Sequence, residues 1–497
     1  MMIIFQRSIM KPSDTSQPIS NSGLPTTWGR QFWYAYYFFT QKFIIMKLTL
    51  KFTAYAFLIG ISVLTSKKLI AQVSGTIIIP GDYPTITAAL NQINAVGLSG
   101  PTILELQPGY VSPNESFPIV FNNILGGSAT NTLTLRPSAG ATGRIIASSF
   151  SNATIDLLNV SNVIIDGRPG GFGVTKELTI QNYDAFGEAL RFSSGANNNT
   201  VKYCTLTGAN TTSIGGVVFF DTSAATVTGN IMNTIAFNVI KNDIIGVPYN
   251  GIYSSGRTYI PNSGNSIINN EILNFSNSGI DITSSGNGGN WTITGNSFYN
   301  NLATSPSTPQ TGINFKPGLS SDGNTIENNF IGGQGINASG AKWINTGAVA
   351  FTGIYLSAGT SSGTALHNNV IKNIALTSGG AIEFTGVSIA SGLTANNGNI
   401  IGSATEPNSI TVSGSSSSIT GILVNSAAAV SITGDNIGNI TTDGVGANIT
   451  GIKYTGGRAM TIMGNNIHEF FSQQYRQCRF YWCIYCRRRN NSVFITW

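Results

Sequence analysis

The chain has 497 residues, of which 9% are charged, 41% are hydrophobic and 58 are glycine. A polar chain with so few charged residues could be disordered, but Ile and Val recur at short intervals between the polar residues. That pattern favours short strands separated by tight turns. The net charge of +6 comes from the two ends, because residues 73–467 contain 18 acidic and only 13 basic side chains. This excludes nucleic acid as a partner, since its recognition needs a basic surface.

The first 71 residues have the features of an export signal preceded by extra sequence. Residues 1–45 are rich in aromatic side chains and end at a second methionine, Met46. Two lysines and the apolar run FTAYAFLIGISVLT follow, which predicts a secretory signal peptide at 46–71, cut after Ala71. We interpret residues 1–45 as misassigned upstream sequence, the alternative being a genuine extension or membrane anchor. The apolar run is too short to predict a membrane span, and none is expected in the mature chain.

Residues 72–155 are predicted to form an N-terminal cap and the first turns of a repeat. The segment 85–98 (TITAALNQINAVGL) is the best helical stretch and follows the turn sequence GDYP. A helix here would cover the sheet edges that the first repeat leaves open. The strands expected next lie at 102–107, 117–121, 131–136, 143–147, 164–167 and 178–182.

Two motifs recur in step through residues 156–467. The first is a glycine before a β-branched residue, at Gly216, Gly251, Gly279, Gly312, Gly353, Gly386, Gly421 and Gly451. The second is Asn-x-Ile or a close variant, ending at Ile240, Ile272, Phe298, Ile331, Ile371, Ile401, Ile437 and Ile467, with Asp435 replacing one Asn. Two motifs that keep step over so many copies indicate a repeat architecture.

The uneven spacing of the motifs selects among repeat folds. Helical repeats need helix formers, whereas Gly, Asn, Thr and Ser dominate here. Propeller blades carry four longer strands. A parallel β-helix tolerates rungs of different length, because loops bulge outward while strands stay stacked. The sequence therefore predicts an all-β, right-handed single-stranded parallel β-helix (a solenoid) with inward columns of Ile and Val and ladders of Asn side chains.

Residues 468–497 depart from this pattern. Three of the four cysteines lie in this segment. Cys483 and Cys486 have the C-x-x-C spacing of zinc and redox sites, but no second pair accompanies them. A frame shifted by one nucleotide would turn Trp482 into glycine and let residues 481–485 read T-G-V-Y-I. That is the first motif, at the place where its next copy is due. We therefore predict that the tail is frameshifted.

The segments GDYPTITAAL, SGPTILELQPGYVSPNESFPI, ATNTLTLRPSAG and SNVIIDGRPGG resemble the opening of large surface proteins of Bacteroidetes, which carry a pectin-lyase-like β-helix. The later repeats resemble the parallel β-helix repeat family. The resemblance covers roughly residues 73–467. It implies this fold, export to the cell surface or the medium, and a full gene product with a C-terminal sorting domain. It does not imply an activity, because the fold hosts many.

Catalysis in this fold would need an arrangement of charges. A lyase needs acidic ligands for Ca²⁺ and a basic residue, and a hydrolase needs paired carboxylates. Asp184 and Glu188 are close in sequence but have no assignable basic partner at repeat distance. Asp166 and Arg168 are the best catalytic candidates, although a turn Asp and a surface Arg closing an early rung would look the same. No metal or other cofactor is expected, and no motif supports Ca²⁺.

Aromatic side chains suggest a ligand. We predict that Tyr253, Tyr259, Trp291 and Trp343 stack on sugar rings, the alternative being packing of loops on strands. The favoured interpretation is a secreted or cell-surface, non-catalytic scaffold, adhesin-like or in contact with polysaccharide or a cell-surface glycan. Two alternatives remain: a polysaccharide lyase or glycoside hydrolase, and a structural surface-layer or fibre component.

Overall fold

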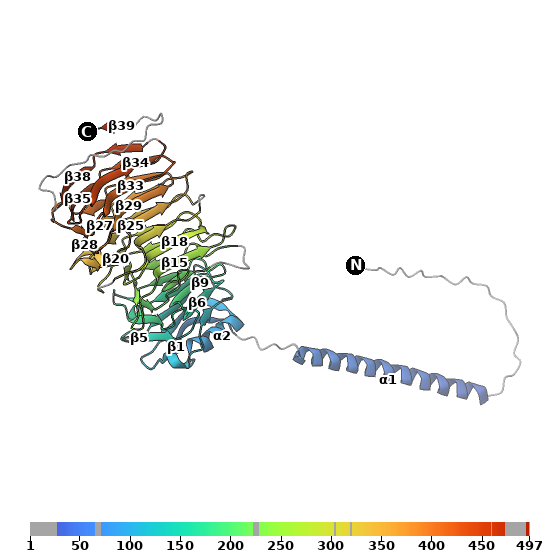
Figure 1. Ribbon diagram of the computed structural model, residues 1–497. Helices are drawn as coiled ribbons and strands as arrows, with labels where there is room; N and C mark the ends of the chain where they lie inside the picture. The colour runs from blue at the N-terminus through green and yellow to red at the C-terminus, as the bar shows by residue number, and fades with distance from the viewer. Residues whose placement is uncertain are drawn as a thin grey trace, which may run out of the picture. The chain divides into compact units, whose positions relative to one another are not determined.

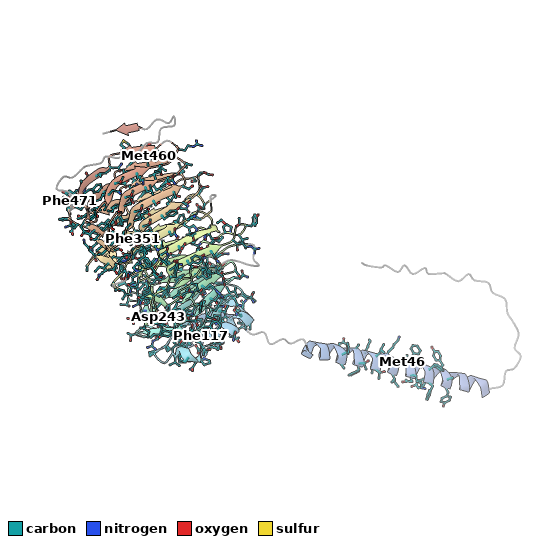
Figure 2. All side chains as sticks on the ribbon, in the orientation of Figure 1. Met46, Phe117, Asp243, Phe351, Met460 and Phe471 are labelled. Carbon is teal, nitrogen blue, oxygen red and sulfur yellow. The ribbon has the colours of Figure 1, made fainter. Side chains whose placement is uncertain are left out.

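The computed structural model describes residues 27–64, 71–221, 228–302, 305–318, 321–458, 460–472 and 494–496. The chain divides into two units, Met1–Ile70 and Ala71–Trp497. In the first, helix α1 spans Thr27–Leu64 and passes through Met46, labelled in Figure 2, without a break. No helix in the described part of the chain is both long and apolar enough to cross a bilayer.

The second unit is a right-handed parallel β-helix, as predicted. Its strands stack into three parallel sheets, and Figure 1 shows the stack from β1 at one end to β38 near the other. From β4 onward, each turn of the chain contributes strands to the three sheets, called A, C and B, in that order, so consecutive rungs supply neighbouring strands of every sheet.

Sheet A contains β1 (Val73–Ile79), β2 (Leu98–Leu106), β4 (Leu133–Pro137), β7 (Val163–Asp166), β10 (Thr200–Lys202), β13 (Thr234–Ala236), β16 (Ser266–Ile268), β19 (Thr292–Thr294), β22 (Thr325–Glu327), β26 (Thr364–His367), β30 (Thr394–Asn397), β34 (Val430–Thr433), β37 (Met460–Met463) and β39 (Phe494–Thr496). Sheet B contains β3 (Ile119–Phe121), β6 (Ile155–Leu158), β9 (Leu190–Ser193), β12 (Val218–Phe220), β15 (Asn250–Gly256), β18 (Ser278–Gly286), β21 (Gln310–Phe315), β25 (Phe351–Ser357), β29 (Glu383–Ser391), β33 (Ser418–Val424) and β36 (Asn448–Tyr454). Sheet C contains β5 (Arg144–Ser148), β8 (Leu178–Asn182), β11 (Cys204–Gly208), β14 (Val239–Asn242), β17 (Glu271–Leu273), β20 (Ser297–Tyr299), β23 (Phe330–Ile331), β27 (Val370–Ile371), β31 (Ile400–Gly402), β35 (Asn436–Thr442) and β38 (Asn466–Ser472), and it is extended by β24 (Trp343–Asn345), β28 (Ile374–Thr377) and β32 (Ile410–Ser413). Three short 3₁₀ turns lie at Ser112–Asn114, Pro169–Gly171 and Ile336–Ala338.

Helix α2 (Ile86–Val96) is the predicted cap, and its apolar face is buried against the first strands. Thr85 is the N-cap at the start of the helix, its hydroxyl accepting from the Ala88 amide at 3.0 Å. A second cap was not predicted: the Glu115 carboxylate accepts from the amides of Ile86 at 2.6 Å and Thr87 at 3.0 Å. Glu115 comes from the next turn of the chain, so it ties the cap to the solenoid.

The predicted inward column exists in sheet C. Ile272, Ile331 and Ile371 occupy one register line and are fully buried. The structure also explains why the two motifs keep step. A Cβ added to Gly353 in sheet B would lie 2.6 Å from Cδ1 of Ile371 in sheet C and 2.5 Å from the backbone oxygen of Gly386. Each first-motif glycine from Gly251 onward thus makes room for the second-motif side chain that follows it along the chain.

The predicted asparagine ladder runs along the bend between sheets A and C. Each side-chain Nδ2 donates to the Oδ1 of the next rung, as from Asn296 to Asn329 and from Asn329 to Asn369, both at 3.0 Å. Backbone amides donate to the same oxygens. The ladder includes Asn238, Asn270, Asn296, Asn329, Asn369, Asn399, Asp435 and Asn465. It satisfies buried polar groups that would otherwise be costly.

Asp435 is the one carboxylate in this ladder. Burial raises its pKa to about 6, although hydrogen bonds from Asn399 and Asn396 lower it in part. Its second oxygen stands where an asparagine would carry Nδ2, and it accepts from Asn396 Nδ2 at 2.5 Å. Asn396 in turn occupies the sheet A register line that holds Leu366 and Ile432 in the neighbouring rungs. The two polar residues therefore compensate each other.

We expect Asp435 to make stability depend on pH. The unfolded carboxyl titrates near pH 3.9 and the folded one near 6, so the folded state holds its proton more tightly. Stability contributed by that proton is present below about pH 4 and is lost as the pH rises to about 6, a change of about 3 kcal/mol. The double variant Asp435→Asn/Asn396→Ile, which restores the pattern of the other rungs, should remove this dependence and unfold at higher urea at pH 7.

Urea midpoints measured from pH 4 to 8 for the native chain and this double variant are the test. Burial also raises the pKa values of Glu188 and Asp281, so the native curve alone is not diagnostic, but the difference between the two proteins isolates Asp435. Parallel curves over the whole range would contradict the assignment.

Candidate functional site

The outward face of sheet B carries a continuous line of polar and aromatic side chains, which we call the B column. The inward residues of these strands are aliphatic or aromatic apart from Ser254 in β15, and the residue between them points outward because side chains alternate along a strand. Register pairing aligns one such residue per rung in the order Asp156, Arg191, Phe219, Tyr253, Asp281, Asn314 and Tyr355.

The first part of the B column is a charge cluster. Arg191 donates to Asp156 Oδ2 at 2.6 Å, and Ser193 donates to Asp156 Oδ1 at 2.7 Å. Asp156 and Arg191 lie opposite each other in β6 and β9. Burial opposes the charge of Arg191, but the hydrogen bond and charge of Asp156 and the charge of Asp221 raise its pKa. Arg191 is therefore firmly cationic among carboxylates.

Glu188 lies just before β9 and belongs to the same cluster. It is 7% exposed, and burial raises its pKa to about 7 despite the opposing charge of Arg191. The negative charges of Asp221 and Asp156 add to the rise. Asn210 donates to Glu188 Oε1 at 3.3 Å. At neutral pH this carboxyl group is therefore partly protonated, which suits a proton donor.

The middle of the B column pairs aromatic rings with a second buried carboxyl group. The Phe219 and Tyr253 rings lie 5.5 Å apart with a tilt of 35°. Burial raises the Asp281 pKa to about 6, although hydrogen bonds with Thr283 and Asn314 lower it in part. Within the described residues, no hydrogen bond reaches Asp281 Oδ1. A buried acceptor without a donor is costly, so this oxygen could accept from a ligand hydroxyl.

The structure places only one of the four predicted stacking residues, Tyr253, in the B column, where it is 8% exposed beside the partly exposed Phe219. Tyr259 lies on the loop after β15 and is 93% exposed. Trp291 and Trp343 are 1% and 0% exposed and pack edge-on against Phe220 and Phe351; Figure 2 labels Phe351 within the solenoid. Their indoles present no face to solvent, so the burial argues against the predicted role of these two residues and for core packing.

The predicted catalytic pair is an ion pair that closes a turn. Arg168 donates to Asp166 through Nε at 2.9 Å and through Nη2 at 2.7 Å. Nζ of Lys202 lies 3.5 Å from Oδ2 of Asp166. Burial would raise the Asp166 pKa, but the bonds from Arg168 and the charge of Lys202 lower it overall. The guanidinium also lies over the Tyr203 ring at 4.6 Å. With both oxygens engaged, Asp166 is poorly placed to act as a base.

Sequence reasoning overlooked the charge cluster. The sequence shows no basic partner for Glu188 at repeat distance, but in the structure the same cluster contains Arg191, which pairs with Asp156 of the neighbouring rung. The signal was available: the two residues are 35 positions apart, which is one repeat. Cys204 is buried in the core, and its thiol donates to the Lys202 oxygen at 3.3 Å. Within the described ranges, no three His, Cys, Asp or Glu side chains gather into a metal-binding group.

Comparison with known proteins shows a similarity in fold only. No family model matches the sequence, and no curated protein matches it. The surface adhesin PfbA of Streptococcus pneumoniae is 12% identical, with 82% of this chain and 99% of that chain covered and a TM-score of 0.30. The AlgE4 A-module, a mannuronan C-5 epimerase of Azotobacter vinelandii, is 13% identical, with 82% and 97% covered and a TM-score of 0.30. The catalytic unit of an α-1,3-glucanase of Streptomyces thermodiastaticus is 12% identical, with 68% and 64% covered and a TM-score of 0.25. The parallel β-helix is established by the pairing of this chain's own strands and not by these comparisons.

Proposed function

We propose that this protein is an exported β-helix scaffold that contacts a glycan along the B column. The observation that carries the proposal is the alignment of Phe219 and Tyr253, 5.5 Å apart, with Asp281 next in register on one side and the Arg191–Asp156 pair on the other. Sugar rings offer apolar faces to aromatic rings and hydroxyl groups to carboxylates and amides. The column supplies both kinds of contact in one line on a rigid surface, as carbohydrate recognition requires.

Export is part of the same proposal. The signal peptide predicted at 46–71 would direct the solenoid to the cell surface or the medium, and the boundary between the two units at Ile70/Ala71 lies one residue before the predicted cut. Mass spectrometry of the native N-terminus tests this step. A peptide from residues 12–30 in the mature protein would contradict it.

Glycan binding by the full chain is the central test. A glycan array followed by calorimetry with the best polysaccharide should show binding, and Phe219→Ala and Tyr253→Ala should each weaken it at least about tenfold, or about 1.4 kcal/mol. Phe172→Ala is the matched control, because Phe172 is 82% exposed and lies outside the B column, on the loop between β7 and β8. Melting temperatures of all variants separate lost binding from lost folding.

Two results would overturn the scaffold proposal. Either no glycan binds, or binding survives both column substitutions. If no glycan binds and the purified protein self-associates, the structural surface-layer or fibre alternative would stand.

One observation favours an enzyme as the second candidate. Glu188, whose pKa is raised to about 7, belongs to the same cluster as Asp156, which pairs with Arg191 at 2.6 Å. An acid with a raised pKa near a second carboxylate is the arrangement that glycoside hydrolases use. Release of reducing ends from the bound polysaccharide, abolished by Glu188→Gln with binding intact, would support a hydrolase. A rise in absorbance from unsaturated products would indicate a lyase instead.

A further inference from the structure

A cavity of about 470 Å³ lies at the corner where the chain passes from sheet C to sheet B, and none of its lining residues belongs to the B column. It is formed by the loops of successive rungs, which follow β11, β14, β17 and β20. Strand residues form the B column, whereas loop residues form this corner pocket. Its volume lies within the range of about 300–1,000 Å³ that is common for small-molecule sites.

Backbone hydrogen bonds between rungs hold these loops in place. The Tyr249 amide donates to the Asn210 oxygen at 2.7 Å, and the Ser276 amide donates to the Pro248 oxygen at 2.9 Å. The Asn277 side chain donates to the Pro309 oxygen at 2.7 Å, which joins the last loop to the one before it. The pocket is therefore preformed, and a ligand would need little ordering of the protein.

The lining combines hydroxyl groups with an apolar floor. Six of its ten residues carry a hydroxyl: Thr211, Tyr249, Ser276, Ser305, Ser307 and Thr308. Val247 and Pro306 supply the accessible apolar surface, Phe275 being only 1% exposed, and none of the ten is acidic or basic. A charged ligand group would lose its hydration here without gaining a counter-charge, which is costly.

The hydroxyl groups remain available to a ligand. Ser276 Oγ donates to the Pro248 oxygen at 3.3 Å, Thr308 Oγ1 to the Ser276 oxygen at 3.4 Å, and Thr211 Oγ1 to the Ala185 oxygen at 3.4 Å. These distances are at the long end for O–H donors, so the bonds are weak. Each oxygen also keeps acceptor capacity for a second partner.

We propose that the corner pocket binds one uncharged sugar residue. Such a ring pairs its hydroxyl groups with those of the lining and lays its apolar face on Val247 and Pro306, which are partly exposed. The absence of charge from the lining selects a neutral sugar over a uronic acid. The proposal does not rest on the B column, because the two sites share no residue.

The test uses the full-length protein and four methyl glycosides: those of glucose, galactose, mannose and glucuronic acid. Saturation-transfer NMR at pH 7 should show binding of at least one neutral glycoside and none of the glucuronide. Thr211→Trp and Ser307→Trp, which place an indole at exposed positions of the lining, should each weaken that binding at least tenfold. Thr142→Trp, at an exposed loop position elsewhere, should leave it unchanged.

Tyr253→Ala separates this site from the B column, since it should leave binding of the glycoside intact even where it abolishes polysaccharide binding. The corner pocket assignment is overturned if no neutral glycoside binds, if the glucuronide binds equally well, or if binding survives both Trp substitutions in proteins with a native melting temperature.

Discussion

Replacing Gly353 by alanine should destabilise the solenoid by at least about 3 kcal/mol, the upper range for overpacking of a core. The new methyl carbon would lie 2.5 Å from the backbone oxygen of Gly386 and 2.6 Å from Cδ1 of Ile371. A side chain can rotate away, but the Gly386 oxygen belongs to β29 and cannot move without displacing the next rung. We expect a lower urea midpoint and faster proteolysis than for the native chain.

Gly379→Ala is the matched control, because a Cβ at that position meets no atom within 4 Å. Adding Ile371→Val to Gly353→Ala removes the Cδ1 contact only, so it should recover part of the loss and leave the part due to the Gly386 oxygen. If Gly353→Ala unfolds at the same urea concentration as Gly379→Ala, the close contacts with Gly386 and Ile371 are not the reason why glycine is needed at position 353.

The repeat could be predicted because every rung repeats the same packing problem. Glycine is needed wherever sheet B passes close to the sheet C column, and asparagine is needed wherever the bend leaves backbone amides unpaired. The fold alone therefore requires Gly353, Ile371 and Asn369, and the sequence shows their equivalents in the same order in every repeat. The helix at 86–96 could also be predicted, because Thr85 and the apolar spacing are local signals.

The candidate sites could be predicted only in part, since they depend on which loops cover which face. Sequence cannot distinguish an exposed aromatic residue from a buried one when both follow a turn, so Trp343 and Tyr259 looked alike although one is 0% and the other 93% exposed. The Asp156–Arg191 pair spans one repeat, and it becomes visible only when outward positions are aligned rung by rung. The corner pocket has no sequence signal, because its hydroxyl residues are common in loops throughout the chain.

Asn329→Ala should strongly destabilise the asparagine ladder. Asn329 is fully buried; its Oδ1 accepts from the Asn296 amide at 3.0 Å, and its Nδ2 donates to the Ile293 oxygen at 2.9 Å. Removing the side chain leaves both backbone groups without these partners. At about 1–3 kcal/mol for each buried group, the expected loss is about 4 kcal/mol, read as a fall in the urea midpoint. Asn425→Ala, at an exposed position, should cost almost nothing.

The ladder also predicts which second change restores stability. Asn329→Asp would place a carboxylate oxygen against the Ile293 oxygen, so at pH 7 it should be as damaging as the alanine variant. Asp435 tolerates this arrangement because Asn396 donates to it at 2.5 Å, and Ile293 occupies the equivalent position one rung below Asn329. Ile293→Asn should therefore recover part of the loss in Asn329→Asp and none of it in Asn329→Ala. Equal recovery in both would mean that Ile293→Asn acts through core volume rather than by supplying a donor to the ladder.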